Sequence, residues 1–101
     1  MPRPIRCRRV HGEPSFSIFK PAGVPARELK FSTLTVEDFE ALRLADAELM
    51  PQEKAASRMG ISQPTFSRIL SSARNKIALA ISKGMGILIE GGTYSVRGKE
   101  C

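Results

Sequence analysis

The chain has 101 residues, a length that suits one domain with a single hydrophobic core. Its hydrophobic fraction of 42% and charged fraction of 26% are those of an ordinary globular protein, and no run of about 18 apolar residues could cross a bilayer. The composition therefore excludes a helical membrane protein and predicts no membrane partner, while the net charge of +6 predicts an anionic one.

The first 14 residues contain three prolines and four arginines with little periodicity, which predicts an extended basic arm. Such arms reach into the minor groove of DNA, although a solvated terminus that only raises solubility has the same composition. No apolar stretch of the secretory type follows, so we expect a cytoplasmic protein. In that compartment Cys7 and Cys101 are expected to be free thiols.

Residues 15–19 have the composition of a short strand, and the first predicted helix covers residues 35–49. Thr35 should cap this helix by accepting a hydrogen bond from the amide of Asp38 or of its neighbour. Six acidic side chains and one basic side chain lie between residues 35 and 53, so we expect this helix to face solvent or a partner protein.

The second and third predicted helices cover residues 51–59 and 62–82. Pro51 suits the first position of the second helix. Gly60 should end that helix by adopting the positive φ that a tight turn needs, and Ser62 is a strong N-cap for the third helix. A second strand is predicted at residues 87–90 and a flexible tail at residues 93–101. Residues 15–92 then form one mainly α domain with one or two short strands, which pair with each other or across a dimer.

The third helix has two different faces at 100° per residue. The apolar face carries Phe66, Ile69, Leu70, Ala73, Ile77 and Ala80, and the opposite face carries Pro64, Ser67, Arg68, Ser71 and Asn75. Six basic residues and no acidic residue lie between positions 54 and 89, which favours a surface that faces phosphate. Leu79 falls on the polar side, where a partner subunit or the N-terminal strand could cover it.

This pattern predicts a helix-turn-helix, in which small residues sit at the helix crossing, a glycine at the bend, and apolar residues lock the second helix. The third helix would then enter the major groove, with Arg68 gripping a guanine and Gln63 an adenine. The predicted DNA-binding residues are Ser62, Gln63, Pro64, Thr65, Ser67, Arg68, Ser71, Arg58, Arg74 and Lys76, together with Arg3, Arg6, Arg8 and Arg9 of the arm.

Five blocks in order resemble a known family: MPRPIRCRRV, FKPAGVPARELK, LTVEDFEALRLAD, AASRMGISQPTFSRILSSARNKIALAI and ILIEGG. They are similar to the small bacterial and archaeal family catalogued as domain of unknown function 134, and the second half also resembles region four of the sigma factors. The resemblance implies a transcription-related DNA-binding domain. The chain departs from the family pattern at Met50-Pro51-Gln52, where an aromatic residue and Gln usually begin the second helix.

Other classes of function are weaker. The only histidine, His11, lies in the arm, and the acidic residues cluster on one helix with no nucleophile or phosphate loop nearby, so we expect no enzyme and no cofactor. Cys7 and His11 have an i, i+4 spacing, but zinc needs four ligands, so no metal site is expected. The alternative function is a protein-interaction module that contacts RNA polymerase through Glu37, Asp38 and Glu40 and binds nucleic acid only nonspecifically. One helix-turn-helix reads few bases, so a homodimer is expected.

Overall fold

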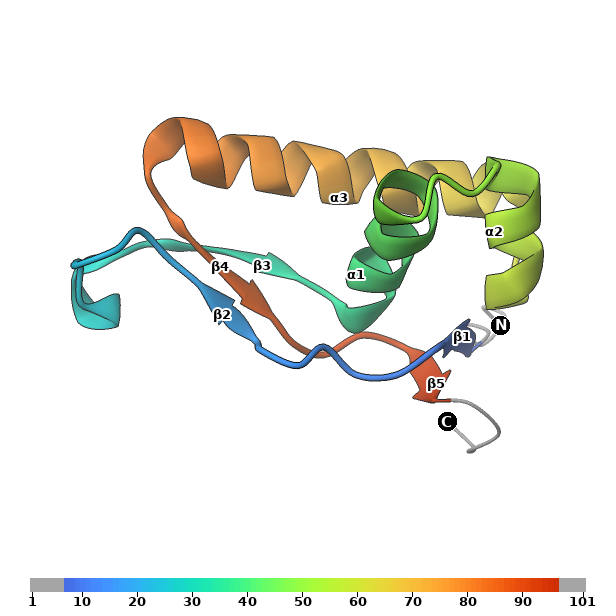
Figure 1. Ribbon diagram of the computed structural model, residues 1–101, viewed down its shortest axis with the longest axis horizontal. Helices are drawn as coiled ribbons and strands as arrows, with labels where there is room; N and C mark the ends of the chain where they lie inside the picture. The colour runs from blue at the N-terminus through green and yellow to red at the C-terminus, as the bar shows by residue number, and fades with distance from the viewer. Residues whose placement is uncertain (1–6, 97–101) are drawn as a thin grey trace, which may run out of the picture.

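The computed structural model describes residues 7–96, and three helices pack beside two small sheets (Figure 1). The helices are α1 (Val36–Leu42), α2 (Gln52–Met59) and α3 (Gln63–Lys83), with a π-helical turn η2 (Arg43–Ala47) after α1 and a 3-10 turn η1 (Ala26–Glu28). The strands are β1 (Arg8–Val10), β2 (Ile18–Phe19), β3 (Phe31–Leu34), β4 (Gly86–Ile89) and β5 (Tyr94–Val96). The predicted fold class, mainly α, is confirmed, but residues 7–96 contain five short strands where one or two were predicted.

Strand β4 is the centre of a three-stranded sheet in the order β2-β4-β3. It runs antiparallel to β2, with Ile18 opposite Leu88, and parallel to β3, with Leu34 opposite Ile89. The two strands predicted from the sequence therefore pair with each other within one chain. Helix α3 crosses one face of this sheet along its β3 side (Figure 1).

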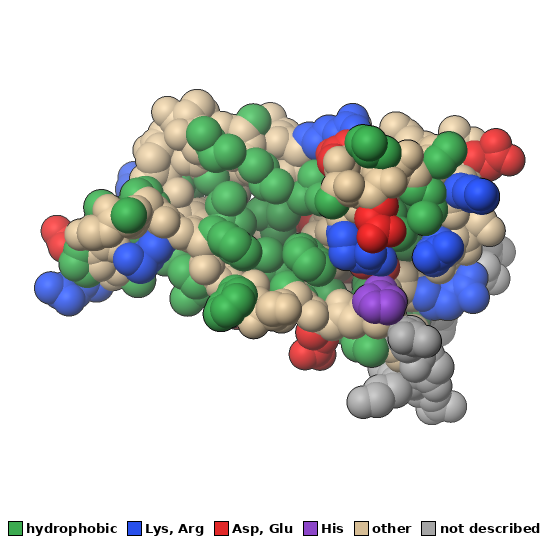
Figure 2. All heavy atoms as spheres, viewed as in Figure 1, with side chains coloured by type: hydrophobic (Ala, Val, Ile, Leu, Met, Phe, Trp, Pro, Cys, Tyr) green, Lys and Arg blue, Asp and Glu red, His purple; other side chains and the backbone are tan. Residues whose placement is uncertain are grey.

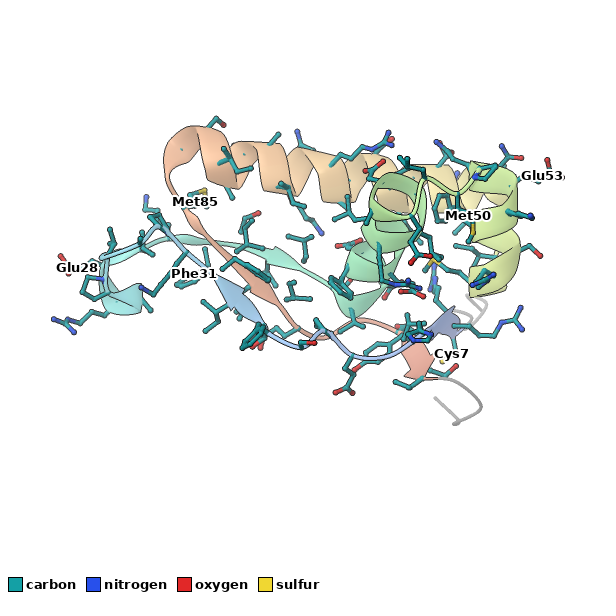
Figure 3. The ribbon with its side chains drawn as sticks, viewed as in Figure 1. Cys7, Glu28, Phe31, Met50, Glu53 and Met85 are labelled. Atoms are coloured by element: carbon teal, nitrogen blue, oxygen red, sulfur yellow. The ribbon has the colours of Figure 1, made fainter. Side chains whose placement is uncertain are left out.

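Strand β3 was not expected from the sequence. Its Ser32 is buried and donates a hydrogen bond to the carbonyl of Lys76 in the middle of α3, at 3.1 Å. Phe31 and Met85 lie at the same end of the sheet (Figure 3), where a Cβ on Gly86 would come within 2.4 Å of the Phe31 ring. A glycine therefore allows β4 to lie directly beside Phe31.

Helix α1 begins as predicted and ends earlier. The hydroxyl of Thr35 accepts from the Asp38 amide while the Asp38 carboxylate accepts from the Thr35 amide, so the cap is reciprocal. The helix was expected to continue to residue 49, but it widens into η2, where the amide of Glu48 bonds to the carbonyl of Arg43. Leu49 then adopts a left-handed conformation (φ 56°), and the Pro51 that follows keeps Met50 out of the helix.

The predicted basic arm (residues 1–14) and flexible tail (residues 93–101) are wrong for part of their length. Strands β1 and β5 form a parallel pair, with Val10 opposite Val96, and Val10 is 3% exposed. The predictions relied on local composition, whereas the pair depends on contacts with α1 that are distant in sequence. Residues 1–6 and 97–101 lie outside the described part of the chain.

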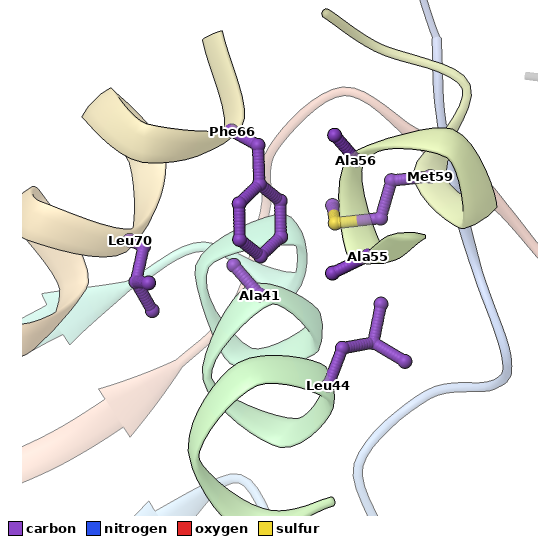
Figure 4. Close-up of a cluster of buried hydrophobic side chains, with 7 residues drawn as sticks. All are labelled: Ala41, Leu44, Ala55, Ala56, Met59, Phe66 and Leu70. Atoms are coloured by element: carbon purple, nitrogen blue, oxygen red, sulfur yellow. The ribbon is translucent and has the colours of Figure 1, made fainter. Parts of the chain in front are cut away.

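The hydrophobic core has two clusters. One lies between α1, α2 and α3 (Figure 4) and consists of Ala41, Leu44, Ala55, Ala56, Met59, Phe66 and Leu70. The other joins α3 to the strands and consists of Val10, Leu34, Val36, Ala73 and Ile89. Helix α3 contributes to both clusters, so its position is fixed along much of its length. No helix within residues 7–96 is long and apolar enough to cross a membrane.

Candidate nucleic-acid interface

The turn between α2 and α3 is built from local signals. Gly60 has φ 71°, and its amide and that of Ile61 close the end of α2 on the carbonyls of Ser57 and Ala56. Ser62 then caps α3 by accepting from the amide of Thr65, and Pro64 sits in the first turn, where an amide donor is not needed. Pro51 is the N-cap of α2 rather than its first residue.

The angle between α2 and α3 is held by the first core cluster (Figure 4). The ring of Phe66 is fully buried and points from α3 toward Ala41 of α1 and the alanine face of α2. Ala55 and Ala56 are also buried, and their small size lets the two helices approach closely. The packing therefore presents the beginning of α3 in a fixed orientation.

The opposite side of this first segment faces outward. Gln63, Pro64, Ser67, Arg68 and Ser71 are exposed, as the sequence predicted, and Ser62 is exposed beside them. Thr65 is half-buried, and its hydroxyl accepts from Ser62 at 2.9 Å. The guanidinium of Arg68 reaches the same hydroxyl at 3.5 Å, a weak contact that leaves the group accessible.

Three of the predicted DNA-binding residues are instead paired with carboxylates. Lys76 donates to Asp38 at 2.9 Å, and Arg8 lies 3.2 Å from Glu37. Arg74 forms two hydrogen bonds to Asp46, at 2.6 and 3.0 Å. These bonds hold the pKa of Asp46 below its usual value. Lys76 and Arg8 are thus structural bases, because each holds a carboxylate of α1. Arg74 is exposed but already engaged.

The remaining predicted bases differ in position. Arg58 is exposed in the last turn of α2. Arg9 is exposed and donates to the carbonyl of Ser57 at 3.3 Å, and its guanidinium lies over Gly60, where a Cβ would come within 2.8 Å of Nε. The β1 strand therefore places one arginine directly on the turn between α2 and α3. Arg3 and Arg6 lie outside the described residues.

The three carboxylates of α1 do not face solvent, contrary to the prediction, whereas Asp46 and Glu48 after it are exposed. Glu40 is 1% exposed, accepts from the amide of His11 at 2.8 Å and accepts from Arg43 at 2.8 and 3.1 Å. These hydrogen bonds raise the pKa of Arg43. Asp38 is buried, and Glu37 accepts from the amide of Thr93. The carboxylates of α1 hold β1, β5 and α3 in place, and their sequence pattern carried no sign of these distant partners.

Cys7 and His11 have the i, i+4 spacing of two metal ligands, but in the structure both residues have other partners. Cys7 is disulfide-bonded, so its sulfur is not a thiolate ligand, and the expectation of a free thiol there is wrong. Within residues 7–96, no three His, Cys, Asp or Glu side chains lie together as metal ligands would. His11 is exposed, and its amide is bonded to Glu40.

Comparison with known proteins places the chain in a family without an assigned activity. The family model described as "Protein of unknown function DUF134" matches residues 1–97. A UPF0251 protein of Moorella thermoacetica is 54% identical over 98 residues, which cover 97% of this chain and 66% of that protein. UPF0251 proteins of Pelotomaculum thermopropionicum and of Thermoanaerobacter sp. are 49% and 50% identical, covering 95% and 99% of this chain and 73% and 88% of theirs.

No solved structure matches this chain. The chain spans about two thirds of the length of the Moorella relative, and the family match covers nearly all of the chain. The protein belongs to the DUF134 family of proteins of unknown function.

Proposed function

We propose that the protein binds double-stranded DNA through a helix-turn-helix formed by α2 and α3 and acts as a regulator of transcription. The observation that supports this proposal is the beginning of α3. It is capped, fixed by Phe66 on one side, and on the other side presents short polar side chains and Arg68. Such a helix end suits the major groove, where base edges offer hydrogen-bond partners.

The short side chains favour close approach to DNA. Ser67 and Ser71 are exposed on the same side as Arg68, so they do not hold the helix away from a groove. Between residues 54 and 89 the sequence contains no acidic residue, and a phosphate near the start of α3 would therefore meet no repelling carboxylate from this segment. Arg9 and Arg58 lie at the adjoining end of α2 and are the proposed phosphate contacts.

The proposed role is binding rather than catalysis. The alternative is an interaction module that contacts RNA polymerase through Glu37, Asp38 and Glu40. These residues are not available for such a contact, since Asp38 and Glu40 are buried and all three carboxylates accept bonds within the fold. Nonspecific nucleic-acid binding stays as the competing hypothesis, because exposed bases alone produce it.

Selection of bound sequences from a random DNA pool separates specific from nonspecific binding. We expect one enriched motif for the unaltered protein and loss of information at one or two positions for Arg68→Ala. Lys83→Ala is the matched control, because Lys83 is an exposed base at the opposite end of the same helix. A pool without any enriched motif would contradict specific readout. Binding of all DNA sequences alike, with an affinity that falls as salt rises, would support the nonspecific alternative.

A further inference from the structure

A large apolar groove separates α3 from the uncovered part of the sheet. Its volume is about 810 Å³. The floor comes from strands β2, β3 and β4, with Phe19, Leu34 and Ile87, and one wall comes from Ile77, Ala78 and Ile81 of α3. In Figure 2 apolar side chains fill this hollow in the middle of the molecule, while Lys and Arg side chains gather toward α2 and β1.

The groove is open because α3 covers only the β3 side of the sheet. Ile81 is 74% exposed and Phe19 is 52% exposed, although both line the groove. Phe16, which lies in the segment just before β2, is 73% exposed. Large apolar side chains at this exposure, gathered on one side of a small domain, are typical of a surface that another protein covers.

The charged residues of the groove restrict what can occupy it. They are Arg43, Asp46 and Arg74, which lie at one end, and each is already engaged: Arg74 with Asp46, and Arg43 with Glu40 and Glu48. An acidic or basic partner segment would find no free opposite charge there. The occupant must therefore be apolar along its length and neutral at its contact.

The α3 wall of the groove is itself such an occupant. Taking 100° per residue, the residues of α3 that line the groove are centred about 90° around the helix from the outward set of Pro64, Ser67, Arg68, Ser71 and Asn75. A two-fold axis that runs in the outward direction near Ala78 then brings residues 73–83 of two α3 helices side by side and antiparallel. Both outward faces point the same way, and each copy supplies the apolar helix that the other groove lacks.

We propose that a second copy of this chain occupies the groove, in an isologous dimer centred on Ala78 and Ile81 of α3 and on Phe19 of β2. The same patch serves both partners, as two-fold symmetry requires. Thirteen residues line the groove and the exposed Phe16 extends it. A stable interface takes about 20–30 residues a side, so part of the dimer contact must come from the surface around the groove.

The dimer proposal does not depend on DNA binding, but one consequence of it rests on the proposed function. Arg68 lies 10 residues before Ala78, about 15 Å along the helix, so the axis separates the two Arg68 residues by about 30 Å along the helix direction. That distance is close to one turn of DNA, about 34 Å, and far below two turns. A palindromic site should therefore have half-sites one turn apart.

Sedimentation velocity without DNA, from 1 to 100 μM protein, tests the interface. We expect the unaltered chain to sediment at twice its 11.1 kDa mass, and Ile81→Glu or Ala78→Glu to raise the dissociation constant at least tenfold. Ala78 is exposed, so its variant keeps a folded monomer even if Ile81→Glu does not fold. Leu79→Glu is the matched control, since Leu79 is also exposed, on the same helix, but does not line the groove.

The outcomes are distinct. A dimer that survives Leu79→Glu and dissociates with both groove variants supports the proposal. An unaltered chain that is monomeric at 100 μM overturns it, as does a dimer insensitive to Ala78→Glu or equally sensitive to Leu79→Glu. A monomer that binds an apolar fluorescent probe, with binding lost in Ile81→Glu, also overturns it and assigns the groove to a small molecule or another protein. Because DNA is absent, none of these results depends on sequence readout.

Discussion

Helix α1 and the first half of α3 both carry polar side chains in a regular pattern, yet they use them differently. The carboxylates of α1 bond inward: Glu40 to the His11 amide and Arg43, and Asp38 to Lys76. On α3, Ser67 and Arg68 are exposed, and the outward face bonds only within its own first turn. Polar groups that close a fold and polar groups left on the surface thus have similar sequence patterns and differ in burial and bonding.

Removal of Glu40 should have the largest effect on stability. In Glu40→Ala, the amide of His11 and the half-buried guanidinium of Arg43 lose their acceptor, and the free energy of unfolding should fall by about 3 kcal/mol. Urea denaturation followed by circular dichroism measures this change. Glu48→Ala is the matched control, because Glu48 also pairs with Arg43 but is half exposed and should cost less than about 1 kcal/mol. Equal effects of the two variants would contradict a structural role specific to Glu40.

Arg68→Ala should change the stability of the protein little and its affinity for DNA strongly. Because Arg68 is exposed and bonded only weakly to Thr65, the free energy of unfolding should change by less than about 0.5 kcal/mol. Binding to the selected DNA site should weaken by about 1–3 kcal/mol, or roughly 5- to 150-fold at fixed salt, as for loss of a bidentate base contact. Fluorescence anisotropy titration measures the affinity. Unchanged affinity in a folded variant would remove Arg68 from the interface.

Lys76→Ala sharpens the contrast because Lys76 lies on the same helix and was predicted to contact phosphate. Its bond to the buried Asp38 makes it a structural residue, so its loss should lower the free energy of unfolding by about 1–2 kcal/mol. The affinity of the folded variant for DNA should stay within about twofold of the unaltered protein, in the same anisotropy titration. A lower salt dependence of binding would instead indicate a phosphate contact at Lys76.

The parts of the fold that follow from neighbouring residues were predictable. The caps at Thr35 and Ser62 and the left-handed Gly60 act within four residues, and the structure shows each of them. Helices α2 and α3 lie within one residue of the predicted ranges. The outward position of Ser67 and Arg68 followed from helical periodicity alone.

What could not be predicted depends on partners far away in the sequence. The amide of Thr93 bonds to Glu37 across 56 residues, and Lys76 bonds to Asp38 across 38. Charge counting assigned Asp38 to a solvent-facing helix and Lys76 to phosphate, because a single sequence does not show that the two meet. Strands β1 and β5 were missed for the same reason, since each is three residues long and forms only by pairing with the other.

Asp46→Asn tests Arg74, an exposed base of α3 that is paired with a carboxylate, and we expect the smallest effect from this variant. Asp46 holds Arg74 by two hydrogen bonds, so the variant frees a guanidinium, and the salt dependence of DNA binding should become steeper by up to about one unit in log–log slope. Glu28→Gln is the control, because it changes net charge equally at an exposed position at the opposite end of the molecule from Glu53 of α2 (Figure 3). If both variants steepen the slope equally, Arg74 does not reach phosphate.

The same pair predicts a pH effect with a defined sign. Since Arg74 lowers the pKa of Asp46, the pair stabilises the fold above the ordinary carboxyl pKa of about 3.8, and this stabilisation is lost as pH falls through the lowered pKa. Asp46→Asn should therefore flatten the acid side of the stability profile measured by urea denaturation. Both side chains are well exposed, 41% for Asp46 and 51% for Arg74, so solvent screening keeps the change small. If the free energy of unfolding of the variant depends on pH on the acid side as in the unaltered protein, the pair holds Arg74 in position without stabilising the fold.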